Sequence, residues 1–189
     1  EPGFATPKEI LDVAIGELEA GNTKYTRGAG SMELCQGVAD YLSKHHDIEV
    51  SAEDVVVTPG AKQAMLYSFL ITTMPGDEVI LLAPSWASYE PMLEFIGAKP
   101  IHVPVRKDNF HPDLDAIREA VTDKTRMILL NSPCNPTGAV FTPDEIQGIL
   151  EIAVDNDLWI VSDEIYSRMV WVDWPHVSPA SLPGGMERT

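Results

Sequence analysis

The stretch Asn131-Ser132-Pro133-Cys134-Asn135-Pro136-Thr137-Gly138, taken with Leu158-Trp159-Ile160-Val161-Ser162-Asp163-Glu164-Ile165-Tyr166, decides the fold of this chain. The first segment is a turn that follows an apolar run, and the second is an apolar run that ends at a carboxylate. In open α/β sheets, ligands bind beyond the carboxyl ends of the strands, so polar residues leaving two such strands can meet in one crevice. Asn135 and Asp163 are therefore expected at one site, suited to a flat, charged heterocycle.

Short apolar runs alternate with helical patterns from residue 54 onward. Strands separated by crossover helices form a mostly parallel sheet with helices on both faces. The expected fold class is thus α/β, with three α/β/α layers. The expected strands are 55–57, 79–82, 100–103, 127–130 and 159–161, and the expected helices are 61–73, 89–96, 112–121 and 143–155.

The N-terminal part has a different pattern. Thr6-Pro7-Lys8-Glu9 reads as a capping box, and an apolar stripe continues from it to Gly21. A polar segment with glycines, 22–30, then precedes a second helical stripe around residues 34–42. We therefore divide the chain into an N-terminal helix and loop, residues 1–30, and a larger α/β domain, residues 31–189.

Composition excludes several classes of partner. The net charge of −16 argues against nucleic acid or an anionic membrane surface, because like charges repel. No apolar run approaches the roughly 20 residues of a membrane span. Two cysteines make no disulfide framework, which favours a reducing cytoplasm. The five histidines lack the spacing of metal ligands, so no metal site is expected.

Two further features lie beyond expected strands. In Thr58-Pro59-Gly60-Ala61-Lys62 a tight turn opens a helix, whose free N–H groups and dipole favour a phosphate, although many such turns only cap a helix. Trp86 follows another strand in a Pro/Ser turn, where an aromatic ring can cover a ligand. Trp159 lies inside a strand and is expected in the core. Asp163 could also simply form an Asx turn or cap a helix.

Together these motifs resemble the large domain of the class I and II aminotransferases, which are fold-type I pyridoxal-phosphate enzymes. The resemblance implies pyridoxal 5'-phosphate as cofactor, with its phosphate held at Gly60, Ala61 and Lys62. It also implies that Trp86 stacks on the pyridine ring and that Asn135 contacts the phenolic oxygen beside an often cis peptide bond. Trp86 and Asn135 would then also contact the substrate.

The same resemblance assigns roles to two residues after the last strand. Asp163 matches the carboxylate that keeps the pyridine nitrogen protonated, so that the ring withdraws electrons from the substrate carbanion. Tyr166 matches a tyrosine that touches the phenolic oxygen. Both are the expected catalytic residues. Glu164 is expected to be structural.

Quaternary structure and substrates are also implied. Tyr25 matches a tyrosine that reaches the phosphate of the partner subunit, so the family implies a homodimer in which the 1–30 unit supplies an interface loop. The implied reaction moves an amino group between an amino acid and a 2-oxo acid.

The Schiff-base lysine of the family is absent from the sequence, because no lysine stands in the family's setting. Lys62 lies in the expected phosphate cup and is a poor substitute. The lysine and the C-terminal small domain are expected beyond Thr189. We therefore expect a fragment, inactive alone, whose residues 31–189 form part of the large cofactor-binding domain.

Other functions remain open at this level. The same framework serves C–S lyases and related pyridoxal-phosphate lyases, including cyclopropane-forming synthases. A non-catalytic α/β binding module would also fit a chain that lacks the lysine. A nicotinamide-binding domain is less favoured, because no GxGxxG follows the first expected strand.

Overall fold

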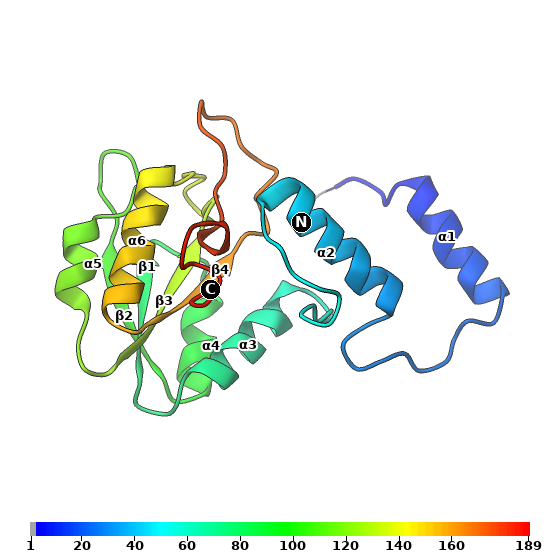
Figure 1. Ribbon diagram of the computed structural model, residues 1–189, viewed down its shortest axis with the longest axis horizontal. Helices are drawn as coiled ribbons and strands as arrows, with labels where there is room; N and C mark the ends of the chain where they lie inside the picture. The colour runs from blue at the N-terminus through cyan, green and yellow to red at the C-terminus, as the bar shows by residue number, and fades with distance from the viewer. Residues whose placement is uncertain (1–2) are drawn as a thin grey trace.

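The computed structural model describes residues 3–189, whose strands form a parallel sheet with helices on both faces (Figure 1). Within these residues the sheet has four strands in the order β2-β1-β3-β4, and every neighbouring pair is parallel. The strands are β1 (Glu78–Ala83), β2 (Lys99–Pro104), β3 (Thr125–Asn131) and β4 (Trp159–Asp163). The α/β fold class predicted from the sequence is confirmed.

Helices cover the two faces of the sheet in pairs. The helices α3 (Ala61–Thr72) and α4 (Tyr89–Phe95) pack on one face, and α5 (Leu114–Ala120) and α6 (Pro143–Asp155) on the other (Figure 1). Two helices precede this body, α1 (Lys8–Glu19) and α2 (Met32–His46), and a 3₁₀ turn, η1 (Pro179–Ser181), follows it. Among residues 3–189, no helix combines the length and the apolar character needed to cross a membrane.

The core consists of two layers because successive strand residues point to opposite faces of the sheet. Ile80 and Ile128 pack with Ile149 of α6, whereas the neighbouring Val79 and Met127 pack on the α3 and α4 side. Burial on both faces explains why the central strands β1 and β3 are nearly continuous apolar runs rather than alternating ones.

The strand predicted at residues 55–57 is wrong. Val57 donates its N–H to the carbonyl of Ala29, and Val55 packs in a small separate cluster with Cys35 and Ala39 of α2. This run therefore lies against α2 and is not a member of the sheet. A high β propensity does not make a strand unless a neighbouring strand is available for pairing.

Two predicted helix starts also differ. Pro7 occupies the N-cap position of α1, and within the described residues no side chain caps that end, so the expected capping box is not formed. The helix expected from residue 112 begins at Leu114, because the Asp113 side chain accepts hydrogen bonds from the N–H groups of Asp115 and Ala116.

Trp159 is the first residue of β4 and is 42% exposed, so its prediction as a core residue is wrong. Strand β4 lies at one end of the sheet that residues 3–189 form, and one side of it is therefore not covered by another strand. A segment near the C-terminus lies along part of this side of β4, because Ile160 donates its N–H to the carbonyl of Arg188 over 2.7 Å.

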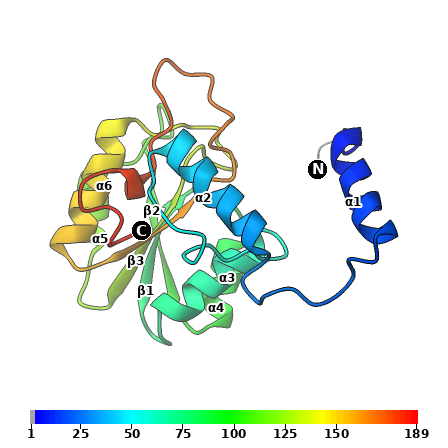
Figure 2. The same cartoon turned by 45° about the vertical axis from the view of Figure 1, so that its right-hand side comes forward.

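Helix α1 lies apart from the body of the molecule (Figures 1 and 2). None of its residues, all of which lie within the described part of the chain, is buried. The division at residue 30 stays a prediction, and residues 1 and 2 of the predicted 1–30 unit lie outside the described residues.

The capping box predicted at the start of α6 is confirmed. The hydroxyl of Thr142 accepts from the N–H of Glu145 over 3.2 Å, and the Glu145 carboxylate accepts from the N–H of Thr142 over 2.9 Å. The buried Glu145 carboxylate also meets His111 Nδ1 at 2.7 Å and Arg106 at 3.5 Å. These contacts fix the helix that connects β3 to β4.

Replacing Thr142 with alanine should lower the free energy of unfolding by about 1 kcal/mol, because it removes the N-cap acceptor of α6. Urea denaturation followed by circular dichroism measures the change. Thr142→Ser keeps the hydroxyl and is the matched control, which should lose less than half as much. Equal losses in the two variants would show that the hydroxyl is not what stabilises this end.

Candidate functional site

A cavity of about 120 Å³ opens at the carboxyl end of the sheet. It lies where β1, β3 and β4 end, as expected for ligand sites in parallel sheets. Its walls combine an aromatic ring, two amides, a carboxylate and two phenols. The lining residues are Ala61, Trp86, Tyr89, Asn131, Asn135, Asp163, Ile165 and Tyr166.

Asp163 is the carboxylate of the cavity and is buried. Its Oδ2 accepts a hydrogen bond of 2.6 Å from the Tyr89 hydroxyl, and its Oδ1 accepts one of 3.2 Å from the N–H of Ile165. An ionised carboxylate can accept about four hydrogen bonds, so capacity remains for a ligand. These two contacts set the direction in which Asp163 faces the cavity.

Tyr89 is a site residue that the sequence analysis missed. It begins α4 and is 1% exposed, with its hydroxyl directed at Asp163. Burial raises the pKa of Tyr89, and the hydrogen bond to the charged Asp163 raises it further. Tyr89 is therefore a neutral phenol that donates to Asp163. Its position three residues after Trp86 was the available sequence signal, but only the packing shows its partner.

Asn131 is the second residue that the sequence analysis left without a role. It ends β3 directly opposite Asp163 of β4 in the strand register. Its Nδ2 donates to the carbonyl of Asp163 over 2.9 Å, while its Oδ1 accepts from the N–H of Asn135 over 2.8 Å. Asn131 therefore fixes the turn that carries Asn135, in which the Asn135–Pro136 peptide bond is cis.

Trp86 forms one wall of the cavity. Its ring packs edge-on against Tyr89, with centroids 5.2 Å apart and planes at 85°. The Nζ atom of Lys62 lies 5.1 Å from the centre of the Trp86 ring, which is a cation–π distance. The structure therefore places the Lys62 side chain against Trp86, while the Lys62 backbone stays in the first turn of α3.

The turn at Gly60 carries the N-terminus of α3 to the cavity. Gly60 has φ 89° and ψ 159°, a region that is open almost only to glycine. The N–H groups of Ala61 and Lys62 follow it, and first-turn N–H groups have no carbonyl within their own helix. The first turn of α3 holds no acidic residue. The arrangement favours an anion.

The remaining predicted residues lie in different places. Tyr166 lines the cavity from the segment that follows β4. Tyr25 is itself fully exposed on the segment between α1 and α2, and it is not among the residues that line the cavity. Within one chain the structure thus brings together Ala61, Trp86, Asn135, Asp163 and Tyr166, next to Gly60 and Lys62, but not Tyr25.

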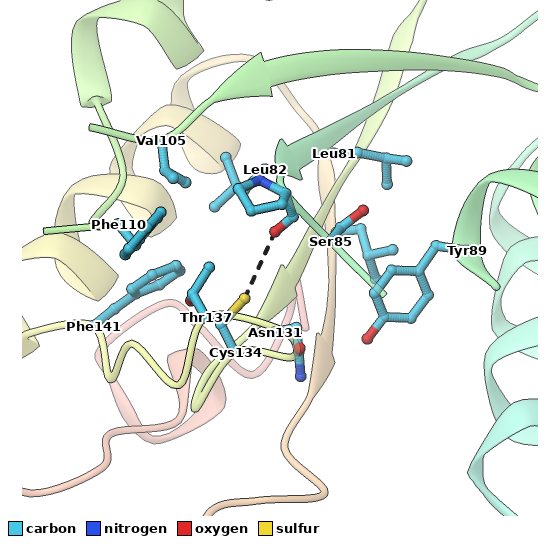
Figure 3. A pocket seen from close by; sticks show the side chains of 12 residues that line it. Leu81, Leu82, Ser85, Tyr89, Val105, Phe110, Asn131, Cys134, Thr137 and Phe141 are labelled. Atoms are coloured by element: carbon cyan, nitrogen blue, oxygen red, sulfur yellow. Dashed lines mark hydrogen bonds between the residues drawn. The ribbon is translucent and has the colours of Figure 1, made fainter. Parts of the chain in front are cut away.

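A second hollow adjoins this cavity, since Tyr89 and Asn131 line both; Figure 3 shows the side chains around this second hollow. Its volume is about 10 Å³, which holds roughly one water molecule. In this hollow the Cys134 thiol faces the carbonyl of Pro84 at 3.8 Å. Its size makes it part of the packing behind the site and not a ligand cavity.

Known proteins resemble this chain over nearly its whole length. The family model described as aminotransferase class I and II matches residues 1–186. An aspartate aminotransferase of Musicola paradisiaca is 38% identical over 191 residues, which cover 100% of this chain and 48% of that protein. A probable aspartate/prephenate aminotransferase of Thermus aquaticus is 39% identical over 96% of this chain and 48% of its own length.

Solved structures agree with these relatives. An aromatic aminotransferase from Pyrococcus horikoshii superposes with a TM-score of 0.96 at 39% identity, over 100% of this chain and 51% of that one. The N-succinyldiaminopimelate aminotransferase from Mycobacterium tuberculosis superposes with a TM-score of 0.96 at 36% identity, and the match covers 99% of this chain and 50% of that one. The chain thus spans about half the length of the curated relatives it matches.

Proposed function

The chain belongs to the class I and II aminotransferase family, and from this premise we propose that the whole protein is a pyridoxal-phosphate-dependent aminotransferase. It would move an amino group between an amino acid and a 2-oxo acid. The observation that carries the proposal is the cavity in which Asp163, held by Tyr89, faces Trp86 and Asn135.

The residues present fit pyridoxal phosphate by their chemistry. The cofactor is a flat heterocycle with a basic ring nitrogen, a phenolic oxygen and a phosphate. The cavity offers a carboxylate, an amide beside a phenol, an aromatic wall and, at one end, the N-terminus of α3. When bound, the cofactor supplies an electron-withdrawing ring that stabilises negative charge at the substrate Cα.

The side chains of this protein would orient that ring and control one proton. Asp163 would hold the proton on the ring nitrogen, because a nearby negative charge favours the protonated form. Trp86 would cover the ring face and exclude water, while Asn135 and Tyr166 would donate to the phenolic oxygen. The N–H groups of Ala61 and Lys62 would bind the phosphate. Asn135 and Trp86 would also contact the substrate.

A homodimer and a cytoplasmic location belong to the same proposal. The exposed Tyr25 and the unburied apolar side of α1 support a partner subunit that covers this end of the chain. The printed names of the relatives include aspartate, prephenate and aromatic aminotransferases, which makes aspartate and aromatic amino acids the first substrates to assay.

The half-reaction of the whole protein tests this function. With pyridoxal phosphate and an amino acid but no 2-oxo acid, a transaminase should release one equivalent of 2-oxo acid per site and then stop. Adding a 2-oxo acid should restart it, as ping-pong kinetics require. Continued turnover with release of ammonia would instead show a lyase, and cofactor binding without turnover would show a binding module.

Replacing Tyr89 with phenylalanine should lower kcat/KM roughly ten- to a hundredfold, since a hydrogen bond to a charged group contributes about 1.5–3 kcal/mol. Tyr89 acts through Asp163, so the loss should appear in steady-state kinetics of a variant that still binds the cofactor. Tyr67→Phe, on the exposed side of α3, is the matched control. A Tyr89→Phe enzyme with an unchanged rate would show that this hydrogen bond does not position Asp163 for the reaction.

A further inference from the structure

Three potential metal ligands meet away from the cavity described above. His46 ends α2, Glu164 directly follows β4, and His176 lies later in the same segment. Each offers one ligand atom, and the three atoms all lie within 4.8 Å of one another. In Figure 1 the end of α2 lies beside the orange segment after β4, which brings these distant parts of the sequence together.

His176 has a buried nitrogen that no hydrogen bond within the described residues satisfies. Its side chain is 6% exposed, and its Nε2 has no hydrogen-bond partner among the described residues, although Glu164 Oε2 lies 3.3 Å away. Leaving a buried polar atom unsatisfied is costly, so such atoms in native proteins are usually satisfied by a bound water or ion. The nitrogen points into the cluster, where a bound cation would satisfy it.

The other two ligands are also held in place. Glu164 Oε1 accepts a hydrogen bond of 2.7 Å from the Ser162 hydroxyl, which leaves Oε2 to face His176. The rings of His46 and His176 lie 5.6 Å apart at 80°. Hydrogen bonds that orient a ligating carboxylate are typical of metal sites, because they fix the ligand before the metal binds.

The surroundings leave room for a further ligand. A hollow of about 270 Å³, lined by His46, His176, His45 and Arg168 among others, opens next to the cluster. The carbonyl end of α2 carries partial negative charge, which favours a cation at His46. The positive charge of Arg168 opposes this and should weaken binding.

We propose that His46, Glu164 and His176 bind one Zn²⁺ ion, with water from the hollow as fourth ligand. Two imidazole nitrogens and one carboxylate oxygen suit zinc, and three protein ligands with one open position form a recognised tetrahedral arrangement. The ion would connect the end of α2 to the segment that carries Tyr166. No sequence spacing indicates this site, because positions 46, 164 and 176 meet only in the fold.

The test is zinc binding by the whole protein, freed of metal and of pyridoxal phosphate. Calorimetric titration with zinc chloride should give one ion per chain, and Co²⁺ in its place should give the visible absorption of a tetrahedral site. His46→Gln and His176→Gln should each weaken zinc binding at least about a hundredfold, since loss of even a second-shell partner typically costs 10- to 100-fold. Arg168→Gln should tighten it.

His102→Gln is the matched control, because His102 also lies beside a carboxylate, Glu90 at 3.4 Å, but its side chain is exposed on β2. It should leave the affinity unchanged, as should His45→Gln, whose ring lines the hollow outside the ligand set. Circular dichroism without metal checks that each variant folds. If His176→Gln does not fold, the comparison rests on His46→Gln, which changes a residue at a helix end. No zinc binding by the parent protein, or equal affinity in His46→Gln and the parent, would overturn the assignment.

Discussion

Replacing Asp163 with alanine in the whole protein should lower kcat/KM by about a thousandfold. Asp163 is buried, accepts from Tyr89 and Ile165, and is the carboxylate that lines the cavity. Removing one partner of a buried charge pair costs about 3–5 kcal/mol, and each 1.36 kcal/mol is about tenfold in rate. Without Asp163 the ring nitrogen of the cofactor would lose its proton, and with it the stabilisation of charge at the substrate Cα.

Steady-state kinetics at saturating cofactor measure this loss in kcat/KM and separate it from weaker binding of the cofactor. Asp115→Ala, on the exposed side of α5, is the control that removes a carboxylate elsewhere in the chain and should leave the rate unchanged. A fall of less than about tenfold in Asp163→Ala, with the cofactor still bound, would place the catalytic carboxylate elsewhere.

Gly60→Ala should weaken binding of pyridoxal phosphate roughly ten- to a hundredfold. Gly60 has φ 89°, and a Cβ there would meet no atom within 4 Å, so the cost comes from the backbone and not from a clash. A non-glycine residue in this region costs about 1–3 kcal/mol, and relief of that strain would turn the N–H groups of α3 away from the phosphate.

Gly76→Ala provides an unusually close control for that variant. Gly76 has φ 94°, and its added Cβ would also meet no atom within 4 Å, but it lies in the turn before β1. Both variants should lose stability in urea denaturation, whereas only Gly60→Ala should lose cofactor affinity in a fluorescence titration. Equal cofactor affinities for the two variants would contradict a phosphate site at this turn.

The sheet could be predicted because short apolar runs alternate with helical patterns along the chain. The runs at 79–82, 100–103, 127–130 and 159–161 all became strands, although only the central strands β1 and β3 are buried along most of their length. The run at 55–57 has the same composition, but it packs on α2, and Trp159 is exposed because β4 ends the sheet. Composition alone does not show which runs find a neighbouring strand.

The candidate site was predictable in part for a related reason. Carboxyl ends of parallel strands share one edge, so Asn135 and Asp163 had to come close once the strands were assigned. The partners of those residues depend on packing between distant segments. Tyr89 reaches Asp163 across 74 positions of sequence, and no local pattern marks such a contact.

The structure of the whole protein with pyridoxal phosphate tests the central claim most directly. We expect the pyridine nitrogen within hydrogen-bond distance of the Asp163 carboxylate, with Tyr89 still donating to Oδ2, Trp86 over the ring, and the phosphate at the N–H groups of Ala61 and Lys62. A ring nitrogen that faces no carboxylate, or a cofactor bound outside this cavity, would contradict the account.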